Sequence, residues 1–201
     1  MYKSLEQGRS MIEMLGVLAI VVVLSVGGIA GYSKAMSMYK LNKWYDNLTQ
    51  VITNLQTAYI NQKSYSDKEE NLTSMLVTAG VISQGILDSN YKDILGNRLT
   101  ISSLLGPVST GIRININHQL PAGKDAVACC KKLYEIPQYY PAAWAVAITD
   151  FKYVVCGKAA PKKYSDFEKC MPYDLAKVAT KCSECETKSC SINFILDNLS
   201  F

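Results

Sequence analysis

The chain opens on a long apolar stretch that then changes into an amphipathic pattern. Residues 14–33 carry no charged side chain. As a helix, twenty residues reach about 30 Å, the thickness of the hydrocarbon core of a bilayer, so the stretch predicts a membrane-spanning helix. Further along, apolar residues recur at three- and four-residue steps, which predicts one continuous helix from about Ser10 to Asn61 with a buried face. That face comprises Leu41, Trp44, Tyr45, Leu48, Val51, Ile52, Leu55 and Tyr59.

From Lys63 onward the pattern is that of a small globular domain. A short helix is expected over Leu72–Ala79, capped by Ser66 or Asp67 and ended by Gly80. The alternation of apolar and polar residues predicts strands, and a second helix follows a proline. The strands are expected at 99–101, 111–117, 143–148, 152–156 and 191–196, and the helix at 121–133. The predicted fold class is therefore α+β, with the long N-terminal helix packed on a small antiparallel β-sheet head that carries short helices and disulfides.

A single carboxylate, Glu13, stands at the edge of the apolar stretch. A charged group near a bilayer centre costs roughly 2.5–3.5 kcal/mol on insertion scales, so such a residue usually has a function. Two simple interpretations are a plain signal anchor, with Glu13 at the interface, and a secretory signal cleaved after Gly28-Ile29-Ala30 to leave Gly31 as the new terminus. The length of the apolar stretch and the position of Glu13 favour a third interpretation.

The run Gly8-Arg9-Ser10-Met11-Ile12-Glu13 resembles the class III signal of type IV prepilins. These precursors have a short polar leader that ends in Gly, are cleaved after it, and carry Glu at the fifth mature position. The resemblance implies cleavage between Gly8 and Arg9, and pairing of Glu13 with the terminal amine of a neighbouring subunit, which sets the register of assembly. Arg9 departs from the family, whose mature chains usually begin with an apolar residue, and this leaves N-methylation of the terminus open.

The head has a weaker resemblance of its own. Ile94-Leu95-Gly96-Asn97-Arg98, the alternating strand after it, and a cysteine-bearing helix after Leu120-Pro121 are similar to the globular domain of type IVb pilins, particularly the PilS-like group. Together the resemblances imply four parts. These are a leader over 1–8, a membrane or filament-core half of the helix over 9–33, an amphipathic half over 34–62 and a globular head over 63–201.

Three glycines, Gly27, Gly28 and Gly31, lie where the apolar pattern ends. Each lowers helix stability by roughly 1 kcal/mol, so they mark a weak point of the helix. The alternative is that small residues let membrane helices pack closely.

Seven cysteines all lie in the second half of the chain, which predicts disulfides if that half reaches an oxidising compartment. They are Cys129, Cys130, Cys156, Cys170, Cys182, Cys185 and Cys190. Because seven is odd, at least one thiol is expected to stay unpaired. In pilins a disulfide near the C-terminus fastens a loop to the sheet, and Cys190 is the best placed for it, with Cys129 or Cys130 as a candidate partner that would close the longest loop. A zinc site at Cys182-x-x-Cys185 with Cys190 is the weaker alternative.

The sequence contains few motifs for catalysis or metal binding. The chain lacks the nucleophile elbow, the phosphate-binding loop and the zinc-protease motif, and its only histidine, His118, is expected on the surface. We therefore predict no enzyme activity, cofactor or metal. The net charge is +4, and the lysines near the C-terminus are diluted by acids, so no specific nucleic acid partner is predicted.

The sequence thus predicts a structural subunit of a type IV pilus. By resemblance, it would sit in the bacterial inner membrane by a single helix before assembly into an extracellular filament. The implied partners are further copies of itself, the membrane, a prepilin peptidase and the inner-membrane assembly machinery. Two alternatives remain: a pseudopilin of a type II secretion system, and a membrane-anchored extracytoplasmic binding domain that does not polymerise.

Overall fold

The computed structural model of the protein describes residues 6–59, 70–103, 114–140, 143–146, 154–157 and 170–196. Within these ranges, the side chains of residues 6–10, 143–146 and 170 are outside the description. The chain divides into two units, Met1–Lys40 and Leu41–Phe201.

The first unit is the N-terminal part of helix α1, which runs from Glu6 to Tyr59 without interruption. Its large apolar side chains from Met11 to Ile29 are 50% to 73% exposed. Among the described helices it is the one that is long and apolar enough to cross a membrane. This confirms the predicted apolar helix and leaves its surface in need of lipid or protein cover.

The second unit begins with the rest of α1, and here the helix has a buried face. Six of the residues in the predicted stripe are at most 3% exposed: Trp44, Leu48, Val51, Ile52, Leu55 and Tyr59. The other two, Leu41 and Tyr45, are partly buried against the same core. The spacing of three and four residues is thus confirmed as the core face of the head.

A sheet of six strands forms the centre of the head, in the order β1-β2-β6-β3-β4-β5. The strands are β1 (Arg98–Ser103), β2 (Ile114–Leu120), β3 (Ala143–Val146), β4 (Val154–Cys156), β5 (Cys170–Met171) and β6 (Cys190–Leu196). Neighbours from β1 to β4 pair antiparallel. The two-residue strand β5 pairs parallel with β4, so the prediction of a purely antiparallel sheet is wrong at this edge.

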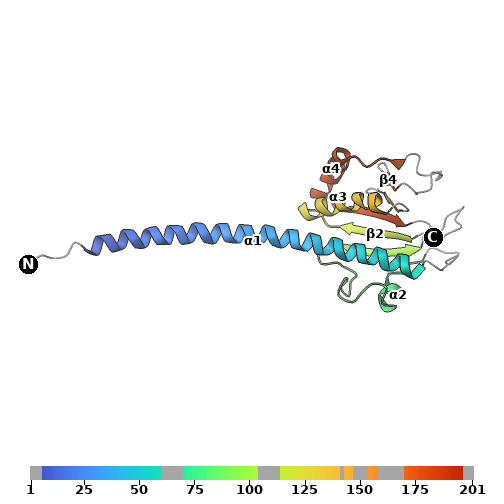
Figure 1. Ribbon diagram of the computed structural model, residues 1–201, viewed down its shortest axis with the longest axis horizontal. Coiled ribbons are helices and arrows are strands. Elements are labelled where there is room, and N and C mark those ends of the chain that lie inside the picture. Colours follow the sequence, from blue (N-terminus) through green and yellow to red (C-terminus); the bar gives the residue numbers. More distant parts are fainter. Residues whose placement is uncertain are drawn as a thin grey trace, which may run out of the picture. The chain divides into compact units, whose positions relative to one another are not determined.

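One face of strand β2 is apolar and the other is polar. In β2, Ile114, Ile116 and Leu120 are buried, whereas Asn115 and Asn117 are partly exposed. The apolar face joins the stripe of α1 and the buried side of α3 in one core. Figure 1 shows the C-terminal part of α1 running alongside β2.

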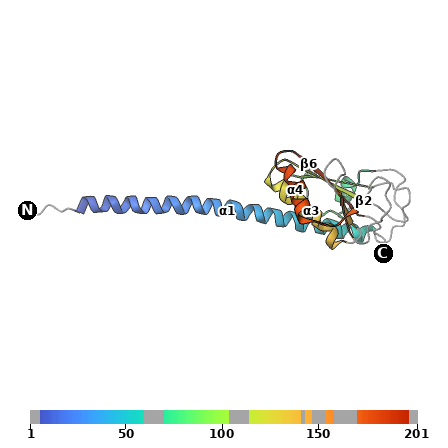
Figure 2. The same cartoon turned by 90° about the horizontal axis from the view of Figure 1, so that it is seen from above.

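Three short helices complete the head. They are α2 (Thr73–Thr78), α3 (Lys124–Tyr139) and α4 (Leu175–Ser183), which continues into the 3-10 turn η1 (Glu184–Glu186). The two helices α3 and α4 lie next to each other (Figures 1 and 2). Asp174 caps α4, because its carboxylate accepts hydrogen bonds from the backbone N–H groups of Ala176 and Lys177.

Several boundaries differ from the predicted ones. Helix α2 begins after Leu72, where the Asn71 side chain accepts a hydrogen bond from the N–H of Thr73, so the cap is neither Ser66 nor Asp67, which lie outside the described residues. Helix α3 begins after Gly123, whose φ of 151° favours glycine, and it runs past Leu133 through Pro137. Strand β2 reaches Leu120, beyond the expected end at 117, because its partner β6 extends equally far.

Candidate functional site

The first candidate site is Glu13 on the apolar part of α1. Its carboxylate is exposed on the helix, and the neighbours Ile12 and Met14 are 73% and 68% exposed. The ion pairs found among the described residues all lie in the head, so none of them involves Glu13. A lone carboxylate on an apolar helix surface lacks a partner, and a partner from another chain would lower its cost in lipid.

Two predicted features of α1 are placed but not explained by the fold. Gly8 and Arg9 lie in the first turns of the helix as backbone positions, so their role in cleavage stays a prediction. The helix runs unbroken through Gly27, Gly28 and Gly31, where an added Cβ would meet no atom outside the local helix within 4 Å. Nothing in the fold of the single chain therefore requires glycine at these three positions.

The disulfides of the head form a second site. Cys130 of α3 is joined to Cys182 of α4, and Cys185 of η1 is joined to Cys190 at the start of β6. The suggested bond from Cys190 to Cys129 or Cys130 is thus wrong, because the chain turns back through η1 and brings Cys185 within 5.4 Å of Cys190, measured between Cα atoms. Both cysteines of the proposed zinc motif are oxidised into different bonds, which excludes thiolate ligation there.

The remaining cysteines differ in their bonding. Cys156 is disulfide-bonded, and the side chain of Cys170 is outside the description. Cys129 is a free, buried thiol. Burial raises its pKa to about 12, so it stays protonated and inert at neutral pH. The expectation that the adjacent Cys129 and Cys130 differ, and that one thiol stays unpaired, is confirmed.

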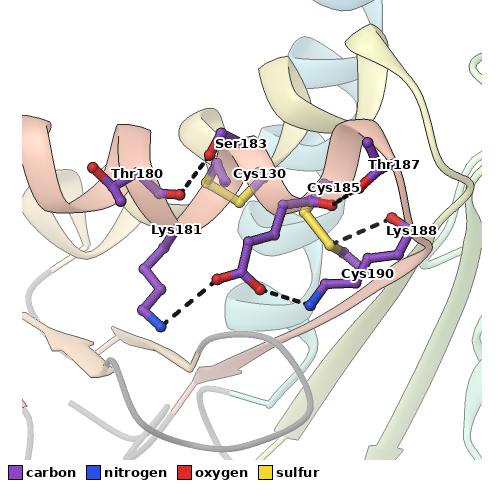
Figure 3. Close-up of a disulfide and its surroundings, with 10 residues drawn as sticks. Cys130, Thr180, Lys181, Ser183, Cys185, Thr187, Lys188 and Cys190 are labelled. Atoms are coloured by element: carbon purple, nitrogen blue, oxygen red, sulfur yellow. Dashed lines mark hydrogen bonds and ion pairs between the residues drawn. A yellow bond between two sulfur atoms is a disulfide. The ribbon is translucent and has the colours of Figure 1, made fainter.

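Polar contacts around the disulfides are weak by comparison. Glu184 forms ion pairs with Lys181 at 3.9 Å and with Lys188 at 2.7 Å (Figure 3). The Ser183 hydroxyl donates to the Thr180 carbonyl at 2.7 Å. Exposed ion pairs of this kind contribute at most about 1 kcal/mol each, so the covalent bonds dominate the local stability. The pairing of these lysines also fits the interpretation of the C-terminal basic residues as ordinary surface.

The third site is a polar cluster inside the head, which the sequence pattern did not predict. The Asp93 carboxylate accepts hydrogen bonds from the N–H groups of Leu95 and Asn97 and from the Asn97 side chain, and the Trp44 side chain lies near it. Burial raises its pKa. The Asn97 amide also lies 3.8 Å from the Cys129 sulfur. The cluster therefore ties α1, the loop before β1 and α3 to one another.

His118 extends this cluster and corrects a prediction. It was expected on the surface, but it is 2% exposed and lies edge-on to Trp44, with ring centroids 5.9 Å apart. The reason is the phase of β2, since His118 follows Ile114 and Ile116 on the inward face. Neither ring nitrogen has a hydrogen-bond partner among the described residues. Burial lowers the pKa of His118 to about 3, so the ring is neutral.

This burial predicts that the head loses stability in mild acid. The unfolded chain takes up a proton at His118 near its ordinary pKa of 6.5, whereas the folded chain does so only near 3. Stability is thus complete above pH 6.5 and falls as the pH drops toward 3. By pH 4.5 the loss is roughly 2–3 kcal/mol. We expect His118→Phe, which cannot titrate, to remove this loss in denaturant unfolding of the detergent-solubilised chain at pH 7.5 and 4.5.

The comparison of the two chains isolates His118 from other groups. Asp93, whose pKa is raised, acts in the opposite direction in acid, but it is present in both chains and cancels in the difference. Parallel pH profiles of the two chains would show that His118 is not buried in its neutral form.

Comparisons with known proteins add no identification. No protein family model matches the chain, and no curated protein sequence matches it significantly. Function is therefore inferred from the sites themselves.

Proposed function

We propose that this chain is a structural subunit of a type IV pilus, made as a precursor, cleaved after Gly8 and assembled into a helical filament. The observation that carries the proposal is α1. One uninterrupted helix combines a bare apolar surface with a carboxylate, Glu13, at the edge of that surface, and its last third belongs to the core of a disulfide-bonded head.

The energetics of the helix favour assembly with other copies. An exposed apolar surface of this size must be covered by lipid or by other apolar helices. When copies leave the membrane and pack side by side, each Glu13 needs a cation at the matching depth. The terminal amine of a neighbour, exposed by cleavage before Arg9, supplies that cation. A mismatched depth leaves a buried carboxylate unpaired, which costs several kcal/mol.

The two parts of the chain then have separate tasks. The apolar helices form the fibre core, and the heads form its outer shell, each joined to the next by the same heterologous contact repeated along the helix. The disulfides suit a head that works outside the cell, where no reductant maintains free thiols. Before assembly the same helix holds the subunit in the bacterial inner membrane, where the peptidase and the assembly machinery meet it.

Electron microscopy of cells with gold-labelled antibodies against the head tests this proposal. We expect label along the length of surface fibres that disappear when the coding sequence is deleted. Label confined to the cell envelope, without fibres, would contradict the proposal and favour the anchored binding domain. Loss of protein secretion without loss of fibres would instead identify a pseudopilin.

A further inference from the structure

A pocket on the head lies next to the Cys185–Cys190 disulfide, and Cys190 forms part of its lining. It has a volume of about 510 Å³, within the range of small-molecule sites. It opens at the end of the β1-β2-β6 part of the sheet, where the buried residues Leu120 and Cys190 also line it. Its lining includes Lys92, Arg98, Gln119, Ser189 and Ser191.

Four of these residues form one straight row across the sheet. Lys92 is bridged to Arg98, Arg98 lies opposite Gln119 in β2, and Gln119 lies opposite Ser191 in β6. Residues directly opposite each other in an antiparallel ladder project their side chains from the same face. With neighbouring strands about 4.8 Å apart, the row is roughly 14 Å long. Two cations and two neutral polar groups therefore face the same space in fixed order.

The charged residues in the described lining of the pocket, Lys92 and Arg98, are both cations. Within the part of the chain that the structure describes, no carboxylate lines it and no ion pair involves Arg98. The placement of Lys92 opposite Arg98 is itself unfavourable, since like charges in directly opposed positions repel. A bound anion between them would relieve this repulsion, and a guanidinium can hold a carboxylate or phosphate with two parallel hydrogen bonds.

Asp88 lies close enough to Lys92 for their charges to attract, whereas none of the ion pairs among the described residues involves Arg98. Asp88 accepts hydrogen bonds from the N–H groups of Asn90 and Lys92, and these bonds lower its pKa. The Asp93 carboxylate accepts its hydrogen bonds within the buried cluster that includes Asn97. The backbone of Lys92 is thus held by Asp88 before any ligand arrives, which reduces the entropy lost on binding.

The rest of the lining selects for a hydroxylated molecule. The Ser191 hydroxyl accepts a hydrogen bond from the Asn117 side chain at 2.8 Å, which leaves its own proton to donate into the pocket. Gln119 and Ser189 both donate and accept. Pro121, at the same rim, offers a small apolar surface for the C–H groups of a ring. We infer that this pocket binds an anionic sugar, with its carboxylate or phosphate on Arg98 and Lys92 and its hydroxyls on Gln119 and Ser191.

Ligand-observed NMR on the full chain tests this inference. The chain is held in a polyoxyethylene detergent, which carries neither sugar nor charge. The probes are glucuronic acid, glucose 1-phosphate, glucose and inorganic phosphate. We expect one or both acidic sugars to bind, with glucose and inorganic phosphate each about tenfold weaker or more, since each lacks half of the contacts. The two acidic sugars separate carboxylate from phosphate recognition.

Matched variants assign the binding to the pocket. Arg98→Gln and Lys92→Gln remove exposed charges without touching the core, and each should weaken binding of the acidic sugars about tenfold. Lys177→Gln removes an exposed charge on α4, away from the pocket, and should leave affinity unchanged. Three results would overturn the inference: no binding of either acidic sugar, equal binding of inorganic phosphate, or an equal loss in Lys177→Gln. None of these results bears on polymerisation, so the pilus proposal stands or falls separately.

Discussion

Glu13→Ala is expected to abolish surface fibres while the subunit stays in the membrane. Without the carboxylate, no ion pair favours the matching insertion depth of an incoming subunit over other depths. The terminal amine of its neighbour is also left unpaired in an apolar core. Breaking such a buried pair costs about 3–5 kcal/mol. The substitution also removes a charge from the apolar helix, which favours membrane retention. We expect at least a tenfold loss of sheared fibres on immunoblots, with an unchanged or larger membrane fraction.

Two further variants show what property of Glu13 matters. Glu13→Gln keeps the size and one acceptor oxygen but loses the charge, so it should fail nearly as badly as Glu13→Ala. Glu186→Ala removes an exposed carboxylate from the head and should assemble normally. Normal fibre yield from Glu13→Ala would show that Glu13 does not pair with a neighbouring terminal amine during assembly.

Loss of the Cys130–Cys182 bond should lower the stability of the head more than loss of the Cys185–Cys190 bond. The first bond spans 52 residues, and the chain-entropy model assigns it about 4 kcal/mol. The double variant Cys130→Ala/Cys182→Ala leaves no buried polar group unsatisfied, so the loss should mainly reflect the missing constraint. Denaturant unfolding of the detergent-solubilised chain measures it.

The matched control is the shorter bond of the same head. Cys185–Cys190 closes only five residues, for which the same model gives about 2 kcal/mol, so Cys185→Ala/Cys190→Ala should lose about half as much. Equal losses in the two double variants would show that local packing, rather than loop closure, sets the contribution of these bonds.

The sequence predicted those parts of the fold that depend on periodicity. The spacing of Trp44, Leu48, Ile52 and Leu55 is enough to identify the core face of α1, because a helix returns to the same side every 3.6 residues. The alternation in β2 likewise predicted a strand with one covered face. The same alternation, extended by two residues beyond Ile116, places His118 on the inward face. The sequence therefore contained the information, but the polar character of histidine favoured a surface position.

Other features depend on contacts between distant parts of the chain. Cysteine pairing requires Cα atoms within about 7 Å, and only the turn at η1 reveals that Cys185, not Cys129 or Cys130, meets Cys190. The row from Lys92 to Ser191 depends on the register of three strands and a bridge, which no periodicity contains. The buried cluster at Asp93 was missed for the same reason, since its partners come from separate elements.

The N-terminus of the protein recovered from its native host shows whether the chain is processed as a prepilin. Intact mass and N-terminal sequencing, with and without the prepilin peptidase, would locate the cleavage site. We predict a mature chain that begins at Arg9 when the peptidase is present and an uncut precursor when it is absent. A chain that keeps Met1 under both conditions, or one that begins at Gly31, would contradict the assignment as a pilus subunit.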